Sequence, residues 1–145
     1  MKTKKYIFFI AALLLIMFVI KYAYTPAKSV QTENLRNKVP ELVLNSNDLI
    51  NAYLIDEEKS NKIYAGKIIE VTGYVEETTL LNNRNTIILA SKNKSFGIIC
   101  DINPNFTTEF NQVQKNQKIR VKGICKGFLK DVILLNCSIE LTPNE

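Results

Sequence analysis

The sequence predicts a mainly β protein, in which a five-stranded barrel follows one helix and an N-terminal transmembrane helix precedes both. Three observations predict this organisation. An uncharged apolar run covers residues 6–20, apolar residues at helical spacing cover 47–63, and a period of two dominates from 69 to 141. The chain has 145 residues. Once an anchor and a tether are set aside, about 100 remain, which suits one small domain.

The formal charge of +5 resides entirely in the first 28 residues. Their lysines surround the apolar run with no acid among them: Lys2, Lys4, Lys5, Lys21 and Lys28. We therefore assign residues 1–24 to a transmembrane signal-anchor. A helix from Tyr6 to Tyr24 would measure roughly 28 Å, enough to cross the hydrocarbon core of a bilayer. The lysines before the run place the N-terminus in the cytoplasm and the bulk of the chain outside.

A charged start and an apolar core also fit a secretory signal that is cleaved. The residues after Ile20 suit cleavage poorly, because Tyr22 and Tyr24 are bulky and Pro26 blocks the site. The segment also lacks a nearby cysteine for lipid attachment. A retained anchor is the favoured interpretation, and secretion after signal cleavage is the alternative.

The composition changes at Thr25. Polar residues and two prolines dominate residues 25–44, with few large apolar side chains. This composition is typical of an extended or weakly ordered tether. We place the folded domain at residues 45–145.

The domain opens with a predicted helix over residues 47–63. Ser46 or Asn47 can cap its N-terminus, and Gly66 follows its end. Strand periodicity begins directly afterwards.

Residues 69, 71, 73 and 75 point to one side of the first strand, and the more polar residues between them point to the other. Gly73 lies within this strand, which indicates a sharp bend at a barrel corner. Further strands are expected at 86–91, 95–101, 118–125 and 132–141, with a short helix at 106–114. Five strands with a short helix between the third and fourth form the order of an OB-type Greek-key barrel.

Two blocks of sequence carry a family resemblance. The first contains Ala52-Tyr53, Asp56-Glu57 and residues 64–75, and the second contains residues 121–127 and 131–137. Through these blocks, residues 47 to 140 resemble the tRNA-anti-like OB-fold family of bacterial proteins. The resemblance implies an OB fold with a leading helix. The members are largely of unknown function, so it implies no catalytic or binding residues.

A nucleic-acid-binding barrel of this type needs a positive groove and aromatic platforms on its second and third strands. The expected second strand has no aromatic residue, and the third has only Phe96. Arg120 and Lys122 alternate on the outer side of a later strand, so Phe96, Arg120 and Lys122 form the candidate binding face. Cations in such positions are also typical of a solvated strand. The balanced charge of residues 29–145 argues against nucleic acid as the partner.

Catalytic chemistry finds little support. The chain has no His, which excludes His-dependent nucleophiles and His-containing metal sites. Asp56, Glu57 and Glu58 are consecutive on a predicted helix and therefore splay around its axis. Neither a calcium loop near Asp101 nor a glycine-rich phosphate loop is present. We expect no enzyme activity, no metal and no cofactor.

The three cysteines, Cys100, Cys125 and Cys137, show no pair separated by only two residues, which removes the redox and zinc-ribbon motifs. Cys125 and Cys137 lie too far apart along the expected hairpin to form a disulfide. The third and fifth strands of an OB barrel are neighbours, so Cys100 and Cys137 are the candidate disulfide in an oxidising compartment. Buried free thiols, acting as small hydrophobic side chains, are the favoured interpretation.

Together these observations predict a membrane-anchored OB-fold module of the bacterial cell envelope. It would sit in the inner membrane with its C-terminal domain outside the cytoplasm, and serve in non-catalytic binding or protein interaction, with an envelope protein or a small ligand as its partner. The alternatives are a periplasmic small-ligand or glycan binder and a nucleic-acid-binding OB domain. An exposed apolar patch of several hundred Å², roughly, would favour a protein partner.

Overall fold

The computed structural model describes residues 13–17, 34–81, 84–92 and 95–141. The chain divides into two compact units, Met1–Gln31 and Thr32–Glu145, and each is described by itself. In the first unit residues 13–17 are helical, and the rest of the predicted transmembrane segment 1–24 lies outside the described residues. Among the described residues, no helix combines the length and apolar character that crossing a bilayer requires.

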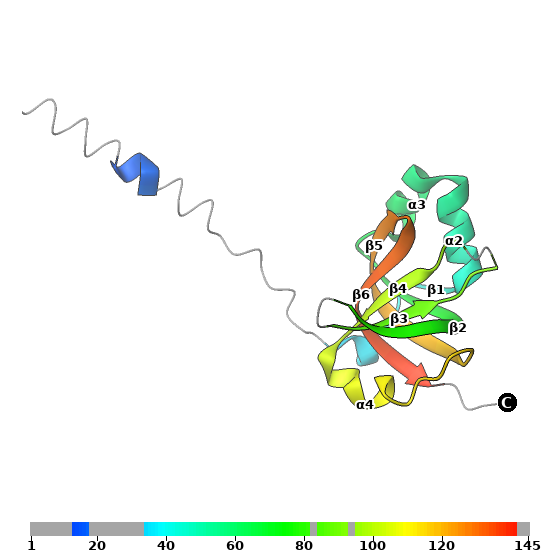
Figure 1. Cartoon of the computed structure of the whole chain (residues 1–145). Helices are drawn as coiled ribbons and strands as arrows, with labels where there is room; N and C mark the ends of the chain where they lie inside the picture. The colour runs from blue at the N-terminus through cyan, green and yellow to red at the C-terminus, as the bar shows by residue number, and fades with distance from the viewer. Residues whose placement is uncertain (1–12, 18–33, 82–83, 93–94, 142–145) are drawn as a thin grey trace, which may run out of the picture. The chain divides into compact units, whose positions relative to one another are not determined.

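The second unit is built on a closed barrel of five strands (Figure 1). These are β2 (Ile68–Leu81), β3 (Arg84–Leu89), β4 (Ile98–Ile102), β5 (Lys118–Leu129) and β6 (Asp131–Leu141). They pair in the order β2-β3-β4-β6-β5, and β5 pairs with β2 to close the barrel. β4 and β6 run parallel, and the other neighbours within the barrel run antiparallel. This strand order is that of an OB-like barrel, as predicted.

β2 contributes to two walls of the barrel because it bends near Gly73. Residues 68–74 pair with β5, and from Val75 onwards the strand pairs with β3. A Cβ at Gly73 would lie 2.9 Å from the Oγ of Ser46. Glycine therefore lets the bent strand approach Ser46, the first residue of the preceding helix α2. The bend predicted from this glycine is confirmed.

The predicted helix over 47–63 is in fact two helices, α2 (Ser46–Ile55) and α3 (Glu57–Tyr64). Asp56 separates them with an extended backbone, at φ −156° and ψ 95°. Its Oδ1 accepts a hydrogen bond from the backbone N–H of Lys59 at 2.9 Å. The prediction of a single helix was wrong because Asp56 caps the N-terminus of a second helix. The acidic residues in the first turn of α3 also favour a helix start there.

The predicted tether 25–44 extends too far. Residues 35–37 form a 3₁₀ helix, η1 (Leu35–Asn37), and β1 (Leu42–Asn45) pairs in parallel with β2 on the outside of the barrel. Leu35 is only 2% exposed. A single buried leucine and a four-residue strand produce little periodicity in a polar segment, so the sequence pattern missed them.

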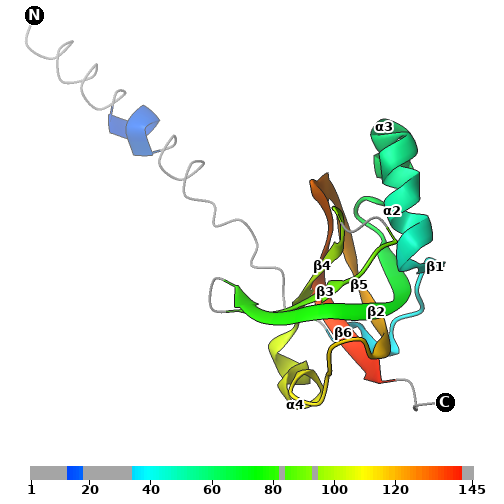
Figure 2. The same ribbon diagram turned by 45° about the vertical axis from the view of Figure 1, so that its right-hand side comes forward.

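The core fills the barrel and extends under the helices. The inward residues of the strands are fully buried, among them Ile69, Val71, Ile87, Leu89, Ile98, Val121 and Leu134. α2 adds Leu49, Ile50 and Tyr53 from one side. Phe106, at the end of the 3₁₀ helix η2 (Pro104–Phe106), also packs into the core. η2 leads directly into α4 (Thr107–Phe110), which is shorter than the helix predicted at 106–114. α3 and α4 lie at opposite ends of the barrel (Figure 2).

Candidate functional site

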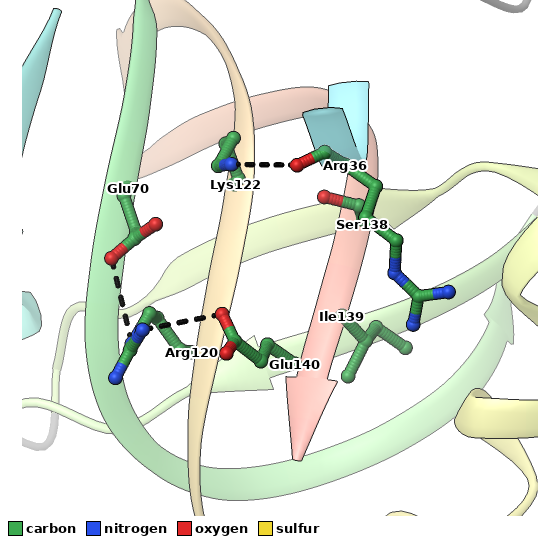
Figure 3. Close-up of a pocket in the computed structure, with 7 residues that line it drawn as sticks. All are labelled: Arg36, Glu70, Arg120, Lys122, Ser138, Ile139 and Glu140. Atoms are coloured by element: carbon green, nitrogen blue, oxygen red, sulfur yellow. Dashed lines mark hydrogen bonds and ion pairs between the residues drawn. The ribbon is translucent and has the colours of Figure 1, made fainter. Parts of the chain in front are cut away.

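A pocket with charged walls lies on the outer surface of the barrel, where β2, β5 and β6 are neighbours (Figure 3). Its cavity measures about 330 Å³, and we call it the charged pocket. Its lining residues are Arg36, Glu70, Arg120, Lys122, Ser138, Ile139 and Glu140. The strand register aligns them, since Lys122 pairs with both Glu70 and Ser138, and Arg120 pairs with Glu140. Glu70, Arg120 and Lys122 alternate with buried residues along their strands and so point outward.

Arg120 lies between two carboxylates in this pocket. Its Nε is 3.4 Å from Oε1 of Glu70, and its Nη1 is 3.2 Å from Oε2 of Glu140. The side chain of Glu70 is only 13% exposed, so this ion pair is partly shielded from water. The charge of Arg120 is therefore balanced by the barrel itself.

Lys122 attaches η1 to the barrel. Its Nζ donates to the backbone carbonyl of Arg36 at 3.0 Å and to that of Lys38 at 2.9 Å. These carbonyls lie at the C-terminal end of η1, where backbone oxygens lack intrahelical partners and carry partial negative charge. The structure gives Lys122 a clear structural role.

Arg36 fixes the other side of η1. Its Nη2 lies 2.9 Å from Oε1 of Glu109 on α4, and its guanidinium carbon lies 5.0 Å from the centroid of the Phe106 ring. The side chain of Asn34 accepts a hydrogen bond from the N–H of Arg36 and caps the helix. Together with buried Leu35, these contacts hold η1 against β5, β6 and α4.

The three residues of the predicted binding face do not meet. Arg120 and Lys122 share the charged pocket, whereas Phe96 precedes β4 and lies near Phe128 on β5, with ring centroids 6.0 Å apart. Phe128 stacks on Tyr53 at 5.7 Å. Phe96 is thus part of an aromatic cluster that packs against the core.

A second outer surface is apolar, and we call it the aliphatic band. On three adjacent strands Ile88 pairs with Ile99, and Ile99 pairs with Ile133. A neighbouring row joins Ile68 to Ile124 and Ile124 to Leu135. The band consists of Ile68, Ile88, Ile99, Ile124, Ile133 and Leu135, all partly exposed and none belonging to the buried core.

The band was missed at the level of sequence, although a signal was present. Three of its strands carry consecutive aliphatic residues, as in Ile87-Ile88-Leu89, Ile98-Ile99 and Val132-Ile133-Leu134-Leu135. In a barrel with one solvated face, alternate positions are expected to be polar. Successive strand residues point to opposite faces, so a run of consecutive apolar residues indicates a strand that is apolar on both faces.

Asp101 borders the band on β4. Its Oδ2 pairs with Nη1 of Arg84 at 2.8 Å, while its Oδ1 is buried without a hydrogen-bond partner. Burial raises the pKa of the Asp101 carboxyl, and the neighbouring Arg84 guanidinium opposes that rise. The ionised form is thus disfavoured at this position.

All three cysteines are buried free thiols. Burial raises the pKa of the Cys137 thiol, and the neighbouring Cys100 adds to that rise. Cys125 has its sulfur 3.4 Å from the hydroxyl oxygen of Tyr53. In the part of the chain that the structure describes, no three Cys, Asp or Glu side chains are grouped to hold a metal ion.

The sequence and fold were compared with known proteins. The model of the tRNA_anti-like family matches residues 1–139. A comparison with curated protein sequences finds no match.

Among solved structures, a protein of Klebsiella pneumoniae described as a "putative nucleic acid-binding lipoprotein" superposes with a TM-score of 0.56 at 9% identity. The match covers 67% of this chain and 90% of that one. A chain of the S. pombe Stn1–Ten1 complex gives a TM-score of 0.44 at 12% identity, covering 53% and 59% of the two chains. The yeast Stn1 and Ten1 structure gives 0.44 at 16% identity, covering 71% and 63%. The Klebsiella likeness concerns the fold alone.

Proposed function

Because the chain belongs to the tRNA_anti-like family, we propose that it is a membrane-anchored OB-fold module of the cell envelope. In this proposal the aliphatic band binds another envelope protein, and the module performs no catalysis. The single observation that carries the proposal is the band itself, six aliphatic side chains in register on the outer surface.

A protein partner suits this surface better than a nucleic acid. Bases bind OB barrels by stacking on aromatic rings while a positive groove follows the phosphates. β3 and β4, which are described in full, carry Ile88 and Ile99 outward and contain no aromatic residue. Partly exposed apolar side chains that lie side by side on adjacent strands suit the apolar centre of a protein interface.

The cations near the barrel are engaged by its own groups. Arg120 is paired with Glu70 and Glu140, and Lys122 with the carbonyls of η1. A phosphate would have to displace these contacts before either cation could bind it. This internal pairing is a second argument against nucleic acid.

The membrane anchor and the external location are supported by the sequence. The apolar run 6–20 and its flanking lysines have the length and charge of a signal-anchor. This placement would give the aliphatic band access to partners in the envelope.

A polar small molecule is the second candidate ligand, because the charged pocket offers a cavity of about 330 Å³ with carboxylate, guanidinium and hydroxyl groups in its walls. These polar and charged walls suit a zwitterion or a sugar better than an apolar compound, and such a ligand would compete with the ion pairs of Arg120. This candidate uses a surface separate from the band, so the two can be tested independently.

The proposal is tested by site-specific photocrosslinking of the full-length chain in native membranes. A photoreactive phenylalanine analogue is placed at Ile99, at the centre of the band, and at exposed Thr108 on α4 as a control. We expect a discrete protein adduct from position 99 and none from position 108. The variant Ile133→Asn should abolish the adduct, because it places a polar group at the centre of an apolar contact.

The competing ligands give different results. Retention on single-stranded DNA at moderate salt, falling steeply as salt rises, would replace the protein partner with a nucleic acid. An adduct at both positions, or at neither, would also reject the aliphatic band as the binding surface. Circular dichroism of Ile133→Asn checks that the barrel is still folded.

A further inference from the structure

The loop between α4 and β5 (Figure 2) carries five side-chain amides within the seven residues 111–117. Together with the end of β6, this loop encloses a second cavity, which measures about 380 Å³. We call it the amide pocket. Its volume lies in the range of small-molecule sites, roughly 300–1,000 Å³. Its lining residues are Gln112, Gln114, Lys115, Asn116, Gln117 and Leu141.

Backbone hydrogen bonds attach this loop to the barrel. The N–H of Asn116 donates to the carbonyl of Val75 at 2.7 Å, and the N–H of Val75 donates to the carbonyl of Gln117 at 2.9 Å. Val75 is a fully buried residue of β2. Asn116 adopts a φ of 65°, in the left-handed region that asparagine enters more readily than most residues. A loop that is fixed before a ligand arrives lowers the ordering cost of binding.

The amides that line the pocket keep most of their hydrogen-bonding capacity. Oε1 of Gln117 accepts from the backbone N–H of Gln114 at 3.0 Å, which orients this amide and leaves its NH₂ group to donate. Within the described part of the chain, the side-chain amides of Gln112, Gln114 and Asn116 have no hydrogen-bond partner. Each of these three amides offers two N–H donors and one carbonyl acceptor.

This set of groups suits a sugar. Neighbouring hydroxyls of a sugar ring both donate and accept hydrogen bonds, as side-chain amides do, whereas an apolar ligand would cover the amides without satisfying them. Leu141 offers an apolar contact for the C–H groups of the ring. Lys115 is the one charged residue in the lining, which contains no carboxylate, so a carboxylate on the ligand would meet attraction only. A nucleic acid needs several cations along its phosphates.

We propose that the amide pocket binds an acidic oligosaccharide. In this complex the sugar hydroxyls form hydrogen bonds with the amides of Gln112, Gln114 and Asn116, and a carboxylate of the sugar pairs with Lys115. The amide pocket shares no residue with the aliphatic band or with the charged pocket. The inference therefore goes beyond the proposed function and is tested separately from it.

The test is an NMR titration of the ¹⁵N-labelled full-length chain, in micelles of a detergent that has no sugar headgroup. Tetragalacturonate is the acidic probe, and its methyl ester is the neutral probe with the same linkages. We expect the side-chain NH₂ resonances of Gln112, Gln114 and Asn116 to shift together with either probe. The acid should bind about two- to fivefold more tightly than the ester, as one exposed ion pair allows.

Four variants separate the contributions to binding. Asn116→Gly removes an amide but keeps the left-handed backbone, and Gln114→Ala removes a second amide. Each should weaken binding about two- to tenfold, as the loss of a net hydrogen bond does. Lys115→Met should abolish the preference for the acid and leave binding of the ester unchanged. Asn51→Ala removes an exposed amide on α2, outside the pocket, and should leave both affinities unchanged. The backbone resonances of each variant show whether it is folded.

Unshifted amide resonances with both probes, or shifts confined to the charged pocket, would overturn the inference. An affinity that Asn51→Ala lowers as much as Asn116→Gly does would also reject it. A single-stranded DNA oligomer is the third probe. If it shifts the same amides more strongly than the sugar, and the shifts disappear as salt rises, the ligand is a nucleic acid instead. Photocrosslinking from position 99 tests the proposed function on a different surface, so the failure of one proposal is distinguishable from the failure of the other.

Discussion

Ser46 occupies the space that a side chain at Gly73 would need, with its Oγ 2.9 Å and its Cβ 3.0 Å from the position of such a Cβ. The same Oγ donates a hydrogen bond to the carbonyl of Ala90 at 3.0 Å. The first residue of α2 is thus held at the bend of β2. Gly73→Ala should therefore lower the free energy of unfolding by about 1–3 kcal/mol, as overpacking does in tightly packed cores. Urea denaturation measures the loss.

The contact with Ser46 predicts how that loss can be relieved. Ser46→Gly removes the two atoms closest to an alanine Cβ at 73, so it should recover part of the stability that Gly73→Ala loses. A double-mutant cycle measures this coupling free energy. Two losses that simply add would show that the steric explanation is incorrect.

The next prediction concerns Lys122 and η1. Lys122→Met keeps the aliphatic part of the side chain but removes both hydrogen bonds to the carbonyls of Arg36 and Lys38. We expect η1 to open more often, because hydrogen bonds from a charged donor contribute about 1.5–3 kcal/mol when shielded and less near water. Hydrogen exchange at residues 35–38 should become several-fold faster. Lys126→Met, at an exposed position of the same strand, is the control and should leave this exchange unchanged.

The barrel was predictable from sequence because its signals are local. Ile69, Val71 and Val75 alternate with more polar residues, Gly73 indicated the bend, and Asn103-Pro104 indicated the start of the short helix. Each of these features follows from backbone geometry and solvation within a few residues. The family resemblance rests on the same segments, so the resemblance and the strand pattern predict the same fold.

The candidate sites were less predictable, because they depend on contacts between distant residues. The sequence made Lys122 a candidate binding cation, whereas in the structure it donates to the carbonyl of Arg36, a residue of the predicted tether. Phe96 looked like a ligand platform until Phe128 was found beside it. No local rule distinguishes a solvated side chain from one that packs against a segment some 30 or more residues away.

The pH dependence of stability should reveal the buried carboxylate of Asp101. Its pKa is raised in the folded state, so the native protein binds a proton more tightly than the unfolded chain. The stabilising contribution of the neutral form is complete below the unfolded pKa of about 3.9 and is lost as pH rises through the higher folded pKa. Asp101→Asn should remove this dependence. At pH 7 it should be as stable as the natural sequence or about 1 kcal/mol more stable, although it loses the ion pair with Arg84.

Urea titrations of both proteins between pH 4 and 8 check this, and the difference between them cancels the contributions of the other carboxylates. A variant that is clearly less stable at neutral pH would mean that the Arg84 ion pair outweighs the desolvation of Asp101. Arg84→Gln provides the matched comparison. It should destabilise the natural sequence more than it destabilises Asp101→Asn, because only the former retains a carboxylate to pair.

Phe96 supplies the last prediction, since the sequence assigned it to a binding face and the structure assigns it to packing. Phe96→Ala removes a ring that lies 6.0 Å from Phe128 in the aromatic cluster with Tyr53. It should lower the free energy of unfolding by about 1–3 kcal/mol, less than a fully buried phenylalanine because the ring is only partly covered. Tyr74→Ala, which removes an exposed ring on β2, should change stability by less than about 0.5 kcal/mol. Crosslinking from position 99 should persist in Phe96→Ala under conditions where the variant is folded. Loss of the adduct with unchanged stability would show that Phe96 belongs to the binding surface.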